Sequence, residues 1–228
     1  MCALYAVKRM EVLGFPLTYK ISDMKEKWLQ WVTQLQSIAR AGLTFAENQY
    51  DLDRYQQISD LTIDILHNYT EVSHEKIKDL FANETGYQTP KVDVRAAVIK
   101  NRKILLVKEK VDGKWSMPGG WADINSTVRE SAARECLEEA GAIVNSRRVI
   151  AIHLASRHND PLSPYTIYKI IVECELIENS FKENSETLNS GFFSLTDLPE
   201  LSIERTTRKQ IELCFEAKKH KLFETIFD

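Results

Sequence analysis

The apolar residues of the segment 24–87 recur at helical spacing. The first set lies on one helix face at three- and four-residue steps and comprises Trp28, Trp31, Val32, Leu35, Ile38 and Ala39. A second set comprises Tyr55, Ile58, Leu61, Ile65 and Tyr69. We expect Gly42 to end the first helix, and Ser73 and Gly86 to cap and close a short third one. The pattern predicts a small helical domain, with residues 1–23 before Met24 as an extension outside the fold.

The pattern changes to that of strands in residues 88–228, after a linker with helix breakers at Gly86 and Pro90. β-rich runs predict strands at Val92–Ile99, Ile104–Val107, Val149–Ala155 and Thr166–Leu176. The first two are joined by a hairpin at residues 100–103. Helical spacing predicts helices at about Thr127–Ala140 and Arg205–Lys219. Strands with helices on either side indicate an α/β (α+β) fold, with the sheet in the middle of an αβα sandwich.

Composition places the chain among ordinary globular proteins. Of its 228 residues, 43% are hydrophobic and 28% charged, and a net charge of -3 argues against nucleic-acid binding. There is no apolar run of the roughly 18 residues that a membrane span needs. The apolar residues Met1–Val7 are followed by the positive charges of Lys8 and Arg9. A secretory signal has the opposite order, with the positive charge before the apolar run. Four cysteines without a CxxC pair are expected to be reduced thiols in a cytoplasmic protein.

The helix predicted at 127–140 carries the candidate chemistry. Thr127 and Glu130 have the spacing of a capping box, and Gly141 stands where a left-handed cap is expected. Ala133, Cys136, Leu137 and Ala140 share one face, which we expect to contact the core. Glu135, Glu138 and Glu139 fall together on the opposite face.

Three adjacent carboxylates repel one another, since like charges at i, i+4 cost a helix about 0.2–0.5 kcal/mol. A divalent cation would remove this repulsion. Oxygen ligands suit Mg²⁺ or Mn²⁺ better than zinc. The alternative is a solvated acidic helix face.

The stretch Gly119–Ala142 closely resembles the Nudix box, whose pattern is G-x5-E-x7-R-E-U-x-E-E-x-G-U with U an apolar residue. Gly120 matches the first glycine and residues 134–142 match the whole second half. The preceding residues 115–119 are also typical of the family. The sequence departs from the pattern at Ser126, which replaces the first glutamate, and Asn125 stands where glycine is frequent.

The resemblance implies a Nudix-type αβα sandwich with a mixed sheet, and hydrolysis of a nucleoside diphosphate linked to another moiety. It implies that the metal, Mg²⁺ or Mn²⁺, is bound by Glu135, Glu138, Glu139 and Gly119, and that Arg134 holds the glutamates in position. The general base varies within the family. Glu139 is one candidate, and Glu186 or Glu183, in the loop before residues 191–193, are the others.

Substrate contacts are expected outside the box. Arg95 is a candidate for phosphate binding, with a structural ion pair as the alternative. Trp121 is a candidate for stacking on a base, with packing as the alternative. Arg157 and His158 lie in a turn-rich segment that suits a substrate wall, although a histidine in a loop is often simply exposed.

The whole chain from residue 24 to 228 resembles a bacterial Nudix subfamily of ADP-ribose and CDP-choline pyrophosphatases, which carries a motif like residues 26–45 in an N-terminal helical domain. This implies a homodimer and a substrate of either type. Two alternatives stay open. Ser126 supports a Nudix domain that lost catalysis and senses a nucleotide ligand. The second alternative is an active enzyme whose helical domain binds a protein partner through Trp28 and Trp31.

Overall fold

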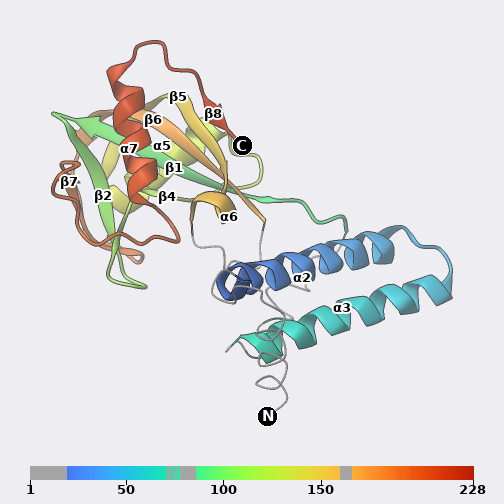
Figure 1. Cartoon of the computed structure of the whole chain (residues 1–228). Helices are drawn as coiled ribbons and strands as arrows, with labels where there is room; N and C mark the ends of the chain where they lie inside the picture. Colours follow the sequence, from blue (N-terminus) through green and yellow to red (C-terminus); the bar gives the residue numbers. More distant parts are fainter. Residues whose placement is uncertain (1–19, 71–72, 74, 76, 78–85, 160–165) are drawn as a thin grey trace. The chain divides into compact units, whose positions relative to one another are not determined.

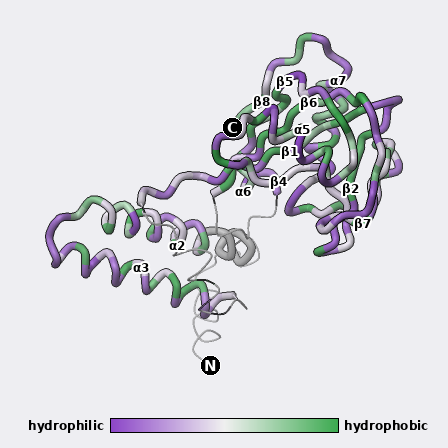
Figure 2. Tube along the Cα trace, turned by 180° about the vertical axis from the view of Figure 1, so that it is seen from behind, coloured by the Kyte–Doolittle hydropathy of each residue, from purple (hydrophilic) through white to green (hydrophobic). Residues whose placement is uncertain are grey.

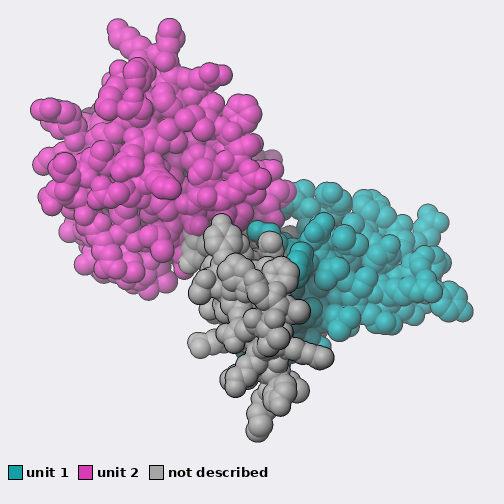
Figure 3. Space-filling model, viewed as in Figure 1, with its two compact units in different colours: residues 1–89 teal, residues 90–228 magenta. Residues whose placement is uncertain are grey.

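The computed structural model describes residues 20–70, 73, 75, 77, 86–159 and 166–228. The chain divides into two compact units, Met1–Thr89 and Pro90–Asp228 (Figures 1 and 3). Each unit has its own buried core. Within the described ranges, none of the helices combines the length and the apolar character that crossing a bilayer would require.

The first unit is built on two helices, α2 (Lys20–Phe45) and α3 (Gln49–Tyr69). Asn48 caps α3, because its side chain accepts the backbone N–H of Asp51 at 2.9 Å. The buried apolar side chains of this unit are Leu29, Val32, Ile63, Leu66 and Ile77. A buried polar contact lies beside them, where the Thr62 hydroxyl donates to Gln36 Oε1 at 2.5 Å.

Gly42 does not end the first helix as predicted, since α2 continues to Phe45. A Cβ at Gly42 would lie 2.3 Å from the ring of Tyr55 on α3. The glycine therefore permits close helix packing. At its other end α2 begins at Lys20, so residues 20–23 belong to the helix and not to an extension before Met24.

The predicted third helix lies mostly outside the described residues. The N–H of Ile77 donates to the carbonyl of Ser73 at 2.9 Å.

The predicted apolar stripe of α2 is divided between two environments. Val32 and Ala39 are buried, whereas Trp31, Leu35 and Ile38 are 61%, 41% and 49% exposed. The stripe on α3 is displaced in the same way, because Ser59, Thr62, Ile63 and Leu66 are buried instead of Leu61 and Tyr69. Both helices therefore present apolar side chains to the surface of this unit.

The second unit contains a mixed sheet, as predicted. Its described strands are β1 (Lys91–Lys100), β2 (Lys103–Glu109), β3 (Trp115–Ser116), β4 (Gly119–Trp121), β5 (Ala142–Leu154), β6 (Ile167–Asn179), β7 (Thr187–Phe193) and β8 (Ile226–Phe227). They run in the order β3-β2-β1-β6-β5-β8, with β4 also paired to β1 and β7 to β2. The β1–β6 pair is parallel, and β1 and β2 form the predicted antiparallel hairpin.

Helices cover both faces of this sheet, which confirms the αβα sandwich. In Figure 1, α7 (Arg208–Lys219) lies in front of the sheet and α5 (Val128–Ala140) behind it. Alternate residues of β1 point to opposite faces, so Val94, Ala96 and Val98 pack with α5, and Ala97 packs with α7. The strands carry the hydrophobic stretches of this unit (Figure 2). The helix predicted from Arg205 begins at Arg208, after the cap Thr207.

Gly141 offers a test of how α5 ends. Its φ is +62°, and an added Cβ would lie 2.4 Å from the carbonyl oxygen of Ser180. Gly113 has a similar φ of +69° but no atom within 4 Å of such a Cβ. We expect Gly113→Ala to cost about 1 kcal/mol of unfolding free energy from backbone strain alone. Gly141→Ala should cost at least ~2 kcal/mol more, because it adds a steric clash.

Urea unfolding of the two variants measures this difference. Equal losses of stability would show that the contact with Ser180 relaxes without cost.

Candidate active site

The ends of α5 set which of its side chains meet the sheet. Thr127 and Glu130 form the predicted capping box, and the N–H of Gly141 closes the last turn on the carbonyl of Leu137 at 3.0 Å. The buried residues of α5 are Ser131, Ala132, Glu135, Cys136, Glu139 and Ala140. The predicted core face was therefore partly wrong, because Leu137 is 56% exposed and Ala132 takes its place. The sheet lies closer to the glutamates than helical spacing alone indicated.

Two of the three glutamates are buried and the third is exposed. Glu135 and Glu139 are 6% and 5% exposed, whereas the Glu138 side chain is 57% exposed. The backbone N–H of Gly119 in β4 donates to Glu139 Oε2 at 2.8 Å. A Cβ at Gly120 would lie 3.1 Å from Glu135 Oε1, so glycine at this position allows β4 to approach the carboxylate. Gly119 and Gly120 thus each contact one of the two buried glutamates.

Arg134 forms ion pairs with both Glu135 and Glu138. Its Nη2 lies 2.8 Å from Glu135 Oε1, and its Nη1 lies 2.8 Å from Glu138 Oε2. Asp123, in the segment before the helix, lies 3.1 Å from Nη2. One guanidinium therefore fixes the relative positions of a buried and an exposed carboxylate.

The environment disfavours ionisation of the buried glutamates. Burial raises the pKa of Glu139 to about 8, although the charge of Arg95 and the Gly119 N–H act in the opposite direction. Burial also raises the pKa of Glu135, and the charges of Glu138 and Glu186 add to this effect while Arg134 and Arg95 oppose it. Loss of hydration is therefore the main cost of ionising these two side chains, and the nearby cations offset it only in part.

Arg95 is a buried ion-pair partner, which is the alternative that the sequence left open. Its side chain is 4% exposed, with Nε and Nη2 on the carboxylate of Asp93 at 2.9 and 2.7 Å. Its Nη1 donates to the carbonyl of Met117 at 3.2 Å. Burial lowers the pKa of Arg95, but Asp93, Glu139 and Glu109 together hold it above its usual value. This burial argues against the predicted phosphate contact. Arg95 instead supplies a buried positive charge that acts on Glu139.

Glu109 is a buried carboxylate that the sequence reasoning missed. It ends β2, is 6% exposed, and accepts a hydrogen bond from the Ser116 hydroxyl at 2.5 Å. Its charge contributes to the raised pKa of Glu139. The available signal was a glutamate two positions after Val107, which strand alternation places on the same face as the buried Leu105 and Val107.

The remaining predicted residues lie in several places. Trp121 is 50% exposed at the end of β4. Arg157 is exposed and lies with His158 in a short helix, α6 (Ala155–His158), where a loop was predicted. The His158 ring stacks on His153 at 3.7 Å, and its Nε2 lies 2.8 Å from Asp228 Oδ1. The following residues of that segment, 160–165, lie outside the described residues.

The two loop carboxylates differ in their surroundings. Glu183 lies 3.2 Å from the ammonium group of Lys110. Glu186 is exposed, and its charge acts on Glu135.

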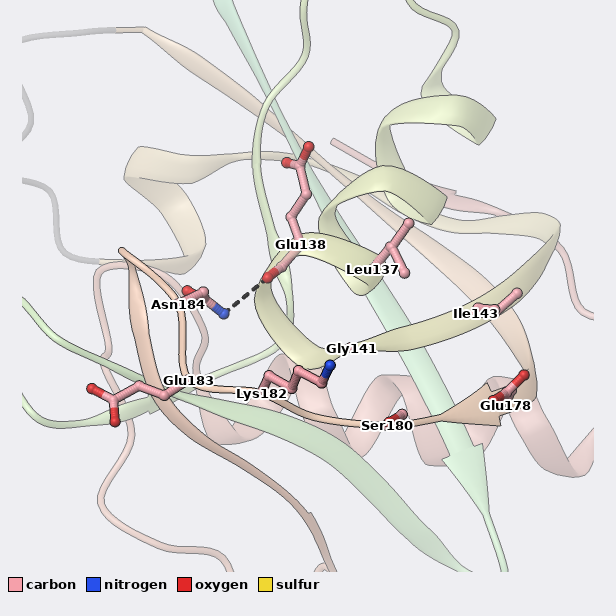
Figure 4. A pocket seen from close by; sticks show the side chains of 9 residues that line it. All are labelled: Leu137, Glu138, Gly141, Ile143, Glu178, Ser180, Lys182, Glu183 and Asn184. Carbon is pink, nitrogen blue, oxygen red and sulfur yellow. Dashed lines mark hydrogen bonds between the residues drawn. The ribbon is translucent and has the colours of Figure 1, made fainter.

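A pocket of about 390 Å³ lies beside the last turn of α5 (Figure 4). Its lining residues are Leu137, Glu138, Gly141, Ile143, Glu178, Ser180, Lys182, Glu183 and Asn184. The buried Glu135 and Glu139 are not among them. We therefore do not assign this pocket to the reacting part of a substrate.

The residues around α5 fit a hard divalent cation. Glu135 and Glu139 offer buried carboxylate oxygens whose ionisation burial disfavours, and the absence of a side chain at Gly120 keeps the Glu135 carboxylate uncovered on that side. Among the described residues, no three acidic, histidine or cysteine side chains converge closely enough to enclose a metal. Mg²⁺ suits this arrangement, because it takes few protein ligands and completes its shell with water and phosphate oxygens.

Two family models match the chain. Residues 26–81 match a UDP-X-like, N-terminal oligomerisation domain, and residues 89–214 match the NUDIX domain. These matches cover both units of the structure.

Individual relatives agree with these matches. YjhB of Bacillus subtilis, provisionally named an ADP-ribose pyrophosphatase, is 37% identical over 205 residues, which cover 90% of this chain and 99% of that protein. A crystal structure of an ADP-ribose pyrophosphatase from Streptococcus suis is 44% identical and covers 61% of this chain and 100% of its own, with a TM-score of 0.58. A UDP-X diphosphatase structure is 27% identical and covers 88% of this chain and 98% of its own, also with a TM-score of 0.58.

The buried position of Glu139 predicts an unusual dependence of stability on pH. An unfolded glutamate ionises near 4.5, whereas the folded-state pKa is about 8, so the folded metal-free protein holds an extra proton between these values. Stability of the metal-free protein therefore falls as pH rises through this window. We expect Glu139→Gln to exceed the metal-free wild type in unfolding free energy by on the order of 1–3 kcal/mol at pH 9, and to match it near pH 4.5.

Urea unfolding in EDTA at several pH values measures this effect. Glu138→Gln is the control, because it removes a charge from the same helix but from an exposed side chain. A difference between Glu139→Gln and wild type that stays constant across pH would refute the assignment.

Proposed function

Because the chain belongs to the Nudix hydrolase family, we propose that it hydrolyses the diphosphate linkage of a nucleoside diphosphate joined to a second moiety. The observation that carries this proposal is the arrangement on α5, where Arg134 contacts Glu135 and Glu138 while Glu139 is held by the N–H of Gly119. The names of the relatives favour ADP-ribose as substrate, ahead of UDP-linked compounds and CDP-choline. The products would be a nucleoside monophosphate and a phosphorylated second moiety.

Mg²⁺ or Mn²⁺ is the proposed cofactor, held by Glu135, Glu138 and Glu139. Gly119 would contribute its carbonyl oxygen, because its N–H is already donated to Glu139. When bound, such a metal neutralises charge on the diphosphate oxygens and lowers the pKa of bound water. Arg134 keeps the carboxylates in one geometry before substrate arrives. This preorganisation avoids reorganising charges during the reaction.

Glu186 is our proposed general base. It is exposed and close enough for its charge to act on Glu135, whereas Glu183 is paired with Lys110. Glu139 is a weaker candidate, since its carboxylate is buried, accepts the N–H of Gly119 and is already proposed as a metal ligand. Glu186 would accept a proton from the attacking water. The water oxygen forms a bond to phosphorus while the bridging P–O bond breaks and the second phosphate leaves.

Trp121 and Arg157 remain our proposed substrate contacts. The half-exposed indole of Trp121 is available to stack on a base, and the exposed guanidinium of Arg157 is available to bind phosphate. His158 is a weaker candidate, because its ring is engaged by Asp228 and His153.

The replacement at Ser126 does not favour a sensor without catalysis. Ser126 precedes the helix cap Thr127, and at 1.5 Å per residue this is more than ~10 Å along the helix from Glu135. Its hydroxyl lies 3.4 Å from that of Ser131. The neighbouring Asn125 adopts a φ of +65°, which asparagine tolerates better than most residues. The departure from the family pattern therefore leaves the glutamate cluster intact.

We expect metal-dependent cleavage of ADP-ribose or a related compound that is lost in a Glu138→Gln/Glu139→Gln variant. The loss in kcat should be at least ~100-fold, since both changes remove proposed metal ligands. Product release is measured with ADP-ribose, UDP-sugars, CDP-choline and nucleoside triphosphates, with Mg²⁺ and with Mn²⁺.

A Glu224→Gln/Glu216→Gln variant removes the same number of charges from exposed positions and serves as the control. Saturable binding of a panel member without turnover by the wild type would replace the enzyme assignment with the sensor one.

The first unit is proposed to form a homodimer. Trp31, Leu35 and Ile38 form an exposed apolar stripe on α2, within residues 26–81 that match an oligomerisation domain. The alternative of a foreign protein bound through Trp28 and Trp31 is weakened, because Trp28 is half-buried against Tyr69 at 5.4 Å. The described cysteines, Cys136, Cys174 and Cys214, are free and buried, which agrees with the cytoplasmic location that we propose.

Substituting the exposed stripe should separate the dimer. We expect Trp31→Glu/Ile38→Glu to sediment as a monomer, because two charges would be desolvated in each half of the interface. Leu222→Glu, at a residue that is 97% exposed in the second unit, should leave the mass unchanged. Analytical ultracentrifugation measures both, and a wild type that is monomeric at micromolar concentration would contradict the proposal.

A further inference from the structure

The loop between β6 and β7 is hydrogen-bonded to the last turn of α5. The final carbonyls of a helix lack partners within the helix. Here the Thr187 hydroxyl donates to the carbonyl of Glu139 at 2.7 Å. The Asn184 amide Nδ2 donates to the carbonyl of Glu138 at 2.9 Å and lies 3.4 Å from that of Glu139 (Figure 4). The turn that carries two of the proposed metal ligands is thus held by Asn184 from this loop and by Thr187, the first residue of β7.

The opposite side of the Asn184 amide holds the backbone of Glu186. Its Oδ1 accepts the N–H of Glu186 and the N–H of Thr187, each at 2.9 Å. The carbonyl of Glu186 accepts the N–H of Lys110, the residue after β2, at 2.9 Å. The backbone of Glu186 is therefore fixed on both sides, while its side chain stays exposed.

Asn184 connects α5 to the backbone of Glu186, and this connection depends on the chemistry of a primary amide. Asn184 uses Nδ2 as a donor toward α5 and also toward the Thr187 hydroxyl at 2.7 Å, and it uses Oδ1 as an acceptor for two backbone N–H groups. Aspartate would keep the acceptor and lose both donors, and serine has one donor on a shorter side chain. Neither replacement reproduces both halves of the contact.

We propose that Asn184 is a positioning residue that sets the distance between Glu186 and the metal-binding turn of α5. This inference rests on the proposed function of Glu186. Asn184 touches no reacting atom and acts through Glu186, whose backbone it binds directly to the helix carrying Glu138 and Glu139. Displacing a catalytic group by about 1 Å reduces turnover strongly while leaving substrate binding nearly unchanged.

A double-mutant cycle tests this connection. We expect Asn184→Asp to lower kcat by roughly 10- to 100-fold with little change in KM, because the loop turn keeps its acceptor but loses its bond to α5. In a Glu186→Gln background the same substitution should change kcat by less than about twofold, since the group it positions is already gone. Equal losses in both backgrounds would overturn the inference, because Asn184 would then act independently of Glu186.

Asn189→Asp is the matched control. Asn189 is exposed in the neighbouring strand β7. Its Oδ1 accepts the N–H of Ser190 at 2.8 Å and makes no described hydrogen bond to α5. Its substitution makes the same chemical change and should leave kcat as in wild type. A loss in Asn189→Asp as large as that in Asn184→Asp would attribute the effect to added charge and overturn the inference.

Two further measurements separate the possible failures. If Glu186→Gln alone leaves kcat unchanged, both the role of Glu186 and the inference about Asn184 are wrong, while metal-dependent hydrolysis is judged separately by the Glu138→Gln/Glu139→Gln variant. If Asn184→Asp lowers the urea midpoint enough to populate unfolded protein in the assay, Asn184→Ser takes its place in the cycle with the same expected outcome. Equal kcat for wild type and the folded Asn184 variant would also overturn the inference.

Discussion

Glu135 and Glu139 are carboxylates buried against a β-sheet, and their burial constrains the rest of the second unit. A carboxylate removed from water is costly unless hydrogen bonds or opposite charges accompany it. Here the Gly119 N–H, the Arg134 guanidinium and the charge of Arg95 supply that compensation in part. The pKa of Glu139 still rises to about 8. A cation bound beside these carboxylates, as we propose, would offset the remaining cost of their burial.

Backbone geometry makes this burial possible. At Gly119 φ is +149°, and an added Cβ would lie 2.0 Å from the carbonyl oxygen of Val94. Glycine at this position and at Gly120 brings β4 against β1 and against the carboxylates of α5. The far end of α5 is held by Gly141 and by the loop that carries Asn184. The C-terminal half of α5 is thus attached both to β4 and to this loop, so the glutamates are positioned by distant segments of the fold.

Each unit departs from ordinary burial in one feature that bears on its proposed role. The second unit buries charged residues, including Asp93, Arg95 and Glu109, around its glutamates. The first unit exposes apolar residues, including Trp31 and Ile38. Buried charge is costly unless it is paired, and apolar side chains gathered on one helix face, unlike scattered ones, favour contact with another surface. The second unit accordingly suits a cation and a diphosphate, and the first suits another apolar surface.

Local patterns in the sequence were sufficient to predict β1, β2, β6 and the second half of β5, together with the capping box, the glycine cap and the αβα layers, but not the short strands or β7. Each of these depends on residues a few positions apart, whose spacing reports directly on helix or strand geometry. The same spacing grouped Glu135, Glu138 and Glu139, and the resemblance to the Nudix box identified the family.

Only the tertiary structure decided which residues meet across the fold. Helical spacing could not determine that Ala132 and not Leu137 faces the core, because the orientation of α5 is set by the sheet beneath it. The pairing of Arg95 with Asp93 and the burial of Glu109 depend on how β1, β2 and β4 come together. The bond from Asn184 to Glu138 joins residues 46 positions apart. Contacts at such separations leave no periodic signal in the chain, since they arise only when distant elements pack.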